Sequence, residues 1–164
     1  MDRASSIASI STGTSPSSNG ITGFRWLNKN TLIPVNCVDD NSYEGIFTKE
    51  GASPKNIITT TINDELKIAT EGDAIVYSIA LERDAAVIGG GHAADGALWF
   101  NKDNKCWCSS KYYFKKAPSW LESYNLLYAN NFTEDNVNAN ITNVALECVN
   151  SCGMGLMTSQ ICCH

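Results

Sequence analysis

CVNSCGMGLMTSQICC, residues 148–163, holds four of the seven cysteines of this chain, and Cys106-Trp107-Cys108 adds two more. Cysteines at this density are typical of proteins that reach an oxidising compartment, where thiols pair as disulfides. We therefore expect a secreted, extracellular protein whose fold is stabilised by disulfide bonds. The seventh cysteine, Cys37, is alone in the first hundred residues.

Six of the seven cysteines can pair, and the sequence alone leaves the pairing open. A bond between the neighbours Cys162 and Cys163 would be strained, so we expect them to reach different partners. Any bond from Cys37 closes a loop of about 70 residues or more and would stabilise the domain by about 4 kcal/mol in the chain-entropy model. We expect its partner to be a C-terminal cysteine. Zinc binding is the alternative, but the paired Cys-x2-Cys knuckles of a zinc ribbon are missing, so we expect no metal. The candidate disulfide residues are Cys37, Cys106, Cys108, Cys148, Cys152, Cys162 and Cys163.

Composition limits the function. The chain has 164 residues, 43% of them apolar, which fits one globular domain. Its formal charge of -5 has the wrong sign for a nucleic-acid-binding protein. No stretch approaches the roughly 20 apolar residues of a membrane span. Residues 1–6 lack a signal-peptide pattern, so the sequence indicates either a cytosolic protein or a trimmed mature chain, and the cysteines favour the second.

The chain divides into two parts. Residues 1–20 contain seven serines and no aromatic residue, so we expect a disordered, Ser/Thr-rich N-terminal segment. Residues 21–164 are expected to form a single disulfide-stabilised, β-rich domain.

Short apolar or alternating runs, broken by turn residues, predict strands from residue 24 onward. Their close spacing favours antiparallel neighbours, and the hairpin signal at residues 101–104 adds another pair. We therefore expect a mainly β fold, an antiparallel sandwich or barrel-like sheet. The predicted strands cover residues 24–27, 31–38, 43–48, 56–62, 66–70, 73–81, 97–100, 106–114, 141–149 and 155–163.

One segment has helical spacing. Trp120, Leu121, Tyr124, Leu127 and Tyr128 recur on a single helical face. Ser119, followed three residues later by Glu122, is a capping box. The sequence therefore predicts one short helix over about residues 119–128, docked on the sheet.

A candidate binding surface follows from lysines interleaved with aromatic residues in an otherwise acidic chain. Such mixed exposure is typical of protein- and glycan-binding faces, because aromatic rings anchor a partner and lysines steer it. A sheet with aromatic residues inward and lysines outward would give the same pattern. The candidate target-binding residues are Trp107, Lys111, Tyr112, Tyr113, Lys115 and Lys116.

Two catalytic patterns are weaker. Cys37 and His92, with Asp95 or Asn101, have the chain order of a papain-like peptidase, but Cys37 lies in a predicted strand and not at the start of a helix. Residues 89–91 are three glycines before His92 and lack the lysine of a phosphate-binding loop, so we expect a flexible turn.

Four segments resemble the motif order of toxin-type ADP-ribosyltransferases: Phe24-Arg25-Trp26, Tyr43-Glu44-Gly45-Ile46-Phe47, Ile58-Thr59-Thr60-Thr61 and Val76-Tyr77-Ser78-Ile79. The resemblance covers about half of the chain. It implies that Arg25 binds NAD, that Thr59, Thr60 and Thr61 shape the nicotinamide pocket, and that a later glutamate, such as Glu134, polarises the ribose. The Glu-x-Glu motif of that family is absent.

The serine-rich head, Cys106-Trp107-Cys108 and the cysteines of residues 148–163 resemble, as a class, the small secreted cysteine-rich effectors and toxins of plant-infecting fungi. This resemblance implies a monomeric, non-enzymatic protein without a cofactor that binds a host protein or cell-surface target. An NAD-dependent ADP-ribosyltransferase and a secreted structural or ligand-carrying domain are the alternatives. NAD cleavage that depends on Arg25 would distinguish the first alternative.

Overall fold

Strand β5 (Gly96–Asn101) lies at the centre of the structure, a computed structural model that describes residues 2–128 and 136–154. Ala97 and Trp99 pack on one side of β5, and Leu98 and Phe100 pack on the other. A continuous apolar run is what a strand covered on both faces requires. Beside β5 lie β4 (Tyr77–Ala80), which is parallel to it, and β6 (Cys106–Ser110), which is antiparallel. Strand β3 (Gly45–Ile46) completes a sheet of order β3-β6-β5-β4.

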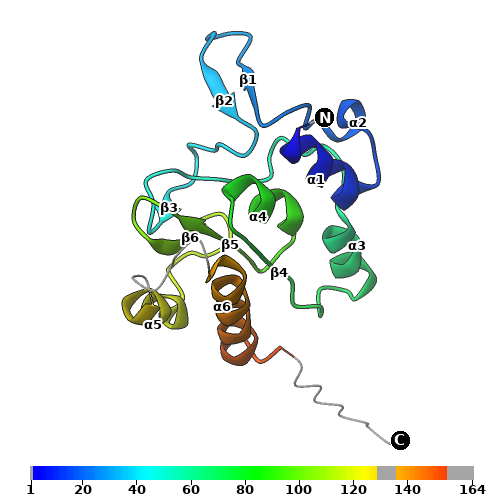
Figure 1. The fold of residues 1–164 in the computed structure, drawn as a ribbon. Coiled ribbons are helices and arrows are strands. Elements are labelled where there is room, and N and C mark those ends of the chain that lie inside the picture. Colours follow the sequence, from blue (N-terminus) through cyan, green and yellow to red (C-terminus); the bar gives the residue numbers. More distant parts are fainter. Residues whose placement is uncertain (1, 129–135, 155–164) are drawn as a thin grey trace, which may run out of the picture.

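Helix α4 (Arg83–Gly90) connects β4 to β5 and covers one face of the sheet. Parallel neighbours require such a crossover, because a short turn cannot return the chain to the same end of the sheet. Val87 and Ile88 of α4 pack into the cluster that contains Trp99. Helix α1 (Arg3–Thr12) packs against α4 through Ala4 and Ala8 (Figure 1).

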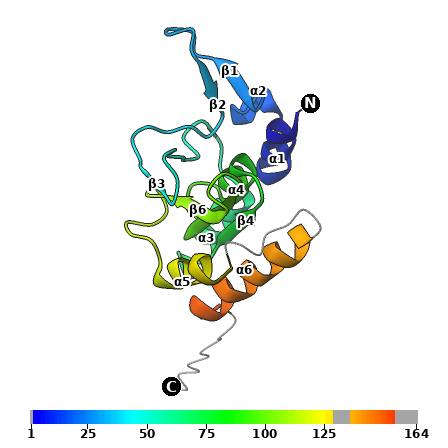
Figure 2. The same cartoon turned by 60° about the vertical axis from the view of Figure 1, so that its left-hand side comes forward.

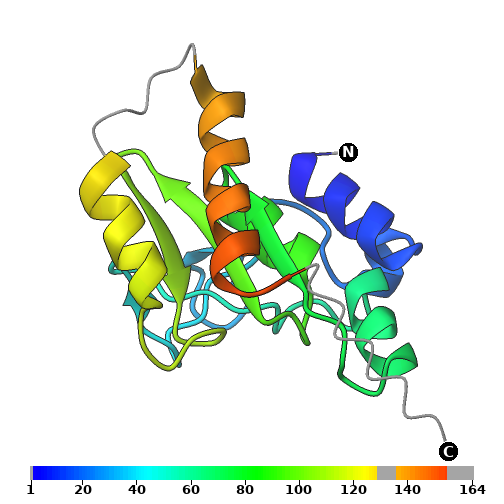
Figure 3. The same cartoon turned by 90° about the horizontal axis from the view of Figure 1, so that it is seen from below.

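Helices α5 (Ser119–Tyr128) and α6 (Val137–Ser151) cover the other face. Leu121 and Tyr124 of α5 and Val144 of α6 form a second core with Leu98 and Trp107. Figure 3 shows α5 and α6 in front of the strands, with α4 behind them. The fold is thus a sheet between two helical layers.

The remaining elements lie around this body. Strands β1 (Arg25–Leu27) and β2 (Pro34–Asn36) form an antiparallel pair outside the main sheet. Figures 1 and 2 show this pair at the opposite end of the molecule from α5 and α6. Helices α2 (Pro16–Asn19) and α3 (Ile62–Ala69) lie near α1.

The expected mainly β sandwich or barrel is wrong, because the fold is mixed α/β with a parallel pair of strands. Helix α6 replaces the strand expected at residues 141–149, and α3 replaces most of the one expected at 66–70. The strand expected at 56–62 is instead a loop that leads into α3. Both helices have local signals that the β-branched residues obscured. In α6, apolar residues recur at helical spacing, and in α3 Thr61 and Asp64 form a reciprocal capping box.

The N-terminal segment also differs from the expected disorder, because residues 3–12 form α1. Asp2 caps this helix, and backbone N–H groups of Ser5 and Phe24 donate to its carboxylate, which lowers the pKa of Asp2. The small side chains of Ala4 and Ala8 allow close packing on α4. Tertiary contact therefore orders a segment whose composition is poor in apolar residues.

Two local predictions are confirmed. Helix α5 has the bounds predicted for the helix at residues 119–128. Strands β5 and β6 pair as the hairpin predicted around residues 101–104. Both signals are local, so they did not depend on the global topology.

The disulfide-stabilised fold is wrong for the part of the chain that the structure describes, because its five cysteines are free thiols. The sulfurs of Cys106 and Cys108 are 3.7 Å apart, and those of Cys148 and Cys152 are 4.0 Å apart, far beyond the roughly 2.05 Å of a disulfide bond. Cys37 is buried in the core beside α4. Cys162 and Cys163 lie outside the described residues.

Candidate functional site

Parallel strands β4 and β5 end at the same edge of the sheet, and open α/β sheets bind their ligands beyond such carboxyl ends. Glu82, Arg83 and Asp84 follow β4, at the start of α4. Asn101 ends β5, and Lys102 follows it. This edge is therefore the candidate functional site.

Arg3 of α1 reaches the same edge. Its Nη2 lies 2.8 Å from Asp84 Oδ1 and its Nε lies 3.3 Å from Oδ2, a two-point contact with a carboxylate that is only 2% exposed. Its Nη1 is 3.9 Å from Glu82. A single half-exposed guanidinium thus compensates a buried carboxylate. We call Arg3, Glu82, Arg83, Asp84 and Lys102 the carboxyl-edge cluster.

Arg83 is the most enclosed cation of this cluster, with its side chain 16% exposed. Its guanidinium is ion-paired with Asp39 and, at 2.8 Å, with Glu50. Arg83 also lines a cavity of about 210 Å³, together with Thr48, Asn101 and Lys102. Two carboxylates, Glu50 and Glu82, line the same cavity. Two cations, their two carboxylate partners, an amide and a hydroxyl therefore border one polar hollow at the carboxyl edge.

The opposite, amino edge of the same strands carries a closed hydrogen-bond network. The buried carboxylate of Asp64 accepts from the Thr61 N–H and hydroxyl and from the backbone N–H groups of His92 and Ala93. The His92 Nδ1 lies 3.1 Å from Asp64, and its Nε2 lies 3.0 Å from the Ile57 carbonyl. Burial alone would raise the pKa of Asp64, but hydrogen bonds from Thr61, His92 and Ala93 outweigh it and lower that pKa.

Gly91 explains the glycine run before His92. Its φ is +75°, and a Cβ there would lie 2.2 Å from the Thr61 hydroxyl oxygen. A side chain at this position would therefore collide with the cap of α3. The glycines expected to be a flexible turn instead end α4 and allow this close approach.

The structure does not join Cys37 and His92 as a peptidase pair. The Cys37 sulfur contacts Asn36, whereas the His92 ring contacts Asp64 and Ile57. Burial, with the nearby charge of Asp84 as a smaller cause, raises the pKa of Cys37 to about 12. Such a thiol is a poor nucleophile near neutral pH.

The predicted target-binding residues occupy different environments. Trp107 is buried in the second core, while Lys115 and Lys116 are exposed. Lys111 is ion-paired with Glu44, and Tyr112 makes an edge contact with Tyr43. The Tyr113 hydroxyl donates to the Gly91 carbonyl at 3.3 Å, and burial raises the pKa of Tyr113. Target binding by the exposed members stays a prediction.

The residues matched to ADP-ribosyltransferases do not share the expected strand arrangement. Arg25 lies on β1, outside the main sheet. Thr61 is the buried N-cap of α3, and Thr59 and Thr60 precede it in a loop and not in a strand. Glu134 lies outside the described residues.

Sequence reasoning missed the carboxyl-edge cluster. Its signal was the order of residues 77–90, an apolar strand, then Glu-Arg-Asp, then an apolar helix. A charged triplet between a buried strand and a helix is typical of a βα junction. The contact of Arg3 with Asp84 had no local signal, because 81 positions separate the two residues.

Within residues 2–128 and 136–154, no helix is long and apolar enough to cross a membrane. The same residues contain no group of three or more His, Cys, Asp or Glu side chains that could hold a metal ion.

Comparison with known proteins shows similarity to alkaline phosphatases. The chain is 37% identical over 121 residues to alkaline phosphatase PhoV of Synechococcus elongatus, which covers 72% of this chain and 22% of PhoV. It is 33% identical over 121 residues to alkaline phosphatase PafA of Elizabethkingia meningoseptica, again covering 22% of that protein. A protein of Myroides odoratus named calcium-transporting ATPase is 34% identical over the same length, 22% of its chain. No protein-family model matches the chain.

The fold agrees with these sequences. The crystal structure of wild-type PafA superposes with a TM-score of 0.71 at 33% identity, covering 75% of this chain and 24% of PafA. A PafA variant with four substitutions gives the same TM-score and covers 78% of this chain. These similarities overturn both the fungal effector and the ADP-ribosyltransferase expected from sequence. The chain spans about a fifth of its curated relatives, and over that span it is similar in sequence and fold to alkaline phosphatases.

Proposed function

We propose that the chain is part of a phosphohydrolase similar to alkaline phosphatases, and that its carboxyl-edge cavity receives the phosphoryl group of a phosphate monoester. The observation that carries this proposal is the 37% identity over 121 residues to PhoV. The position of the cavity supports it, because ligands of open α/β sheets bind beyond the carboxyl ends of the strands. This similarity contradicts the non-enzymatic, target-binding role expected from the sequence.

Arg83 is the residue that we assign to phosphoryl binding. Its guanidinium lines the cavity and begins α4, where the helix dipole favours an anion. A guanidinium presents paired N–H donors that match two phosphoryl oxygens. Its present partner Glu50 is 71% exposed, so this ion pair contributes little and a phosphoryl group can replace it. Asp39 would keep the other side of the guanidinium in position.

Lys102 and Asn101 complete the proposed site from the end of β5. The Lys102 side chain is 66% exposed and lies 3.9 Å from Glu82, so its ammonium can turn to the cavity at small cost. The Asn101 side chain already accepts from the backbone N–H groups of Asp103 and Asn104, which fixes its direction. We assign Lys102 and Asn101 to binding of the phosphoryl group. Hydrolysis of the phosphate monoester by the whole protein is a separate part of the proposal.

Calorimetric titration with phenyl phosphate tests the proposal. We expect saturable binding that weakens at least about tenfold in Arg83→Gln, the equivalent of about 1.4 kcal/mol for a charge-assisted contact. Lys67→Gln is the matched control, because Lys67 pairs with Asp95 at the amino edge and should leave binding unchanged. Release of p-nitrophenolate from p-nitrophenyl phosphate tests hydrolysis in the same samples. Absence of saturable binding, or equal losses in both variants, would contradict the proposed site.

Export from the cytoplasm is also kept as a proposal. Similarity to alkaline phosphatases is compatible with an extracellular location, whereas the free thiols no longer support it. Fractionation of the source cells, followed by detection of this chain, tests the location. Recovery with cytoplasmic proteins alone would exclude export.

A further inference from the structure

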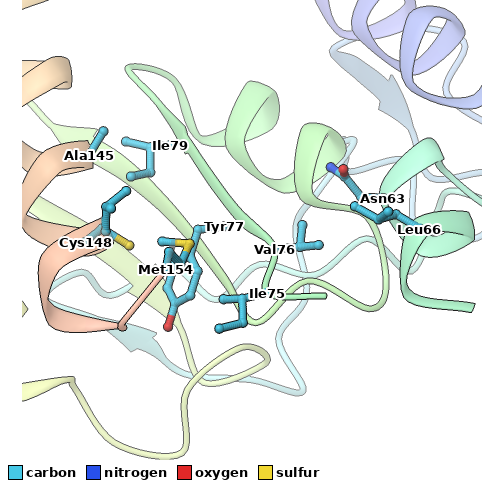
Figure 4. Close-up of a pocket in the computed structure, with 10 residues that line it drawn as sticks. Asn63, Leu66, Ile75, Val76, Tyr77, Ile79, Ala145, Cys148 and Met154 are labelled. Atoms are coloured by element: carbon cyan, nitrogen blue, oxygen red, sulfur yellow. The ribbon is translucent and has the colours of Figure 1, made fainter. Parts of the chain in front are cut away.

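A second hollow lies between β4, α3 and the end of α6. It measures about 460 Å³ and is lined mainly by apolar side chains, including Ile75, Ile79 and Val149. Four groups differ in chemistry from that lining: the amide of Asn63, the thiol of Cys148, the thioether of Met154 and the ring of Tyr77. Figure 4 shows the sulfurs of Cys148 and Met154 pointing toward one another beside Tyr77.

A second thiol joins them from the next turn of α6. The Cys152 sulfur lies 4.0 Å from the Cys148 sulfur, because residues four apart lie on the same helical face. Cys148 is fully buried, and Cys152 is half-buried at the end of the helix. Two neighbouring thiols therefore lie beside a hollow that the thioether of Met154 also lines.

We propose that Cys148, Cys152 and Met154 form a binding site for a soft monovalent cation, copper(I). Thiolate and thioether sulfurs are soft ligands and select Cu(I) over hard cations, which prefer oxygen. The two thiols release one proton each and bind as thiolates, and the thioether adds a neutral third ligand. The copper stays Cu(I), so no oxidant or reductant is needed, and the bound complex carries one negative charge.

The geometry favours this ion over zinc. A structural zinc site takes four ligands in a tetrahedron, and these three sulfurs fall one short. Among the described residues, the lining also contains no carboxylate, the ligand that a hard divalent ion prefers. The sulfur separation of 4.0 Å also suits a bound ion better than a disulfide, which requires an approach to about 2.05 Å.

Anaerobic titration of the reduced full chain with Cu(I), in competition with the chelator bicinchoninate, tests the site. We expect wild type to withdraw one more Cu(I) than Cys148→Ser/Cys152→Ser. The single variant Cys152→Ser should bind that ion at least about tenfold more weakly, because it loses a direct ligand at a half-buried position. Circular dichroism should give the wild-type spectrum for Cys152→Ser, which keeps the test valid if burial makes the double variant unfold.

Met154→Leu separates a three-sulfur site from a simple pair of thiols. Leucine preserves the apolar volume but removes the thioether, so we expect a weaker affinity for the same ion without a change in the far-UV spectrum. Cys106→Ser and Cys162→Ser/Cys163→Ser are matched controls that should retain the ion. Equal copper uptake by wild type and Cys152→Ser, or an unchanged affinity in Met154→Leu, would overturn the proposed site.

Discussion

The two edges of the parallel pair β4 and β5 use the same kinds of residue for different purposes. At the amino edge, the Asp64 carboxylate is buried and accepts several hydrogen bonds from its own fold. At the carboxyl edge, Arg83 and Lys102 border a polar cavity and have partly exposed partners. A carboxylate whose lone pairs are all used stabilises the fold, whereas charges with replaceable partners can bind a ligand.

The largest effect expected from this comparison is at Asp64. Asp64→Asn keeps the shape but replaces one acceptor oxygen by an NH2 group, which leaves buried N–H donors of Thr61, His92 or Ala93 without a partner. We expect a loss of about 3 kcal/mol in the free energy of unfolding. Urea denaturation at neutral pH measures it. A loss below about 1 kcal/mol would mean that this hydrogen-bond network contributes little to the stability of the fold.

Acid should remove part of the Asp64 contribution. Because the folded pKa of Asp64 is lowered, its stabilisation is present above the unfolded value of about 4 and is lost as the pH falls through the folded pKa. The stability difference between wild type and Asp64→Asn should therefore shrink below about pH 4. Urea denaturation from pH 7 to pH 3 follows this difference, and a constant value throughout would contradict the assignment.

The sequence predicted the parts of the fold that depend on residues close together in the chain, and it missed those that depend on contacts between distant residues. Helix 119–128 and the β5–β6 hairpin were predictable, because capping, spacing and turn residues are local. The parallel pairing was not, because it runs through α4, whose terminal glycines indicated a turn. The site was missed for the same reason, since Arg3 and Asp84 meet only after the chain folds. The prediction of a disulfide-stabilised fold was the largest error, because the number of cysteines in a segment does not bring their sulfurs to bonding distance.

A smaller effect on the free energy of unfolding is expected at Asp84, the most buried charge of the carboxyl-edge cluster. Asp84→Asn removes the partner of Arg3 and a negative charge from the first turn of α4, but Arg3 is half-exposed and can be hydrated. We expect a loss of about 1 kcal/mol, mostly from the helix dipole and the ion pair. Thermal and urea unfolding of the two variants Asp84→Asn and Asp64→Asn show which substitution costs more stability. If Asp84→Asn were the more damaging, the contrast between the edges would be reversed.

The smallest effect on stability should come from Lys102, the most exposed member of the carboxyl-edge cluster. Its ammonium is 3.9 Å from Glu82, and its side chain is 66% exposed, so Lys102→Gln should change the free energy of unfolding by less than about 0.5 kcal/mol. The same substitution should still weaken phenyl phosphate binding, because it removes one of the two cations that line the cavity. Urea unfolding and calorimetry on one preparation separate the two effects. A loss of stability without a loss of binding would assign Lys102 to the fold and leave Arg83 as the cation that the phosphoryl group meets.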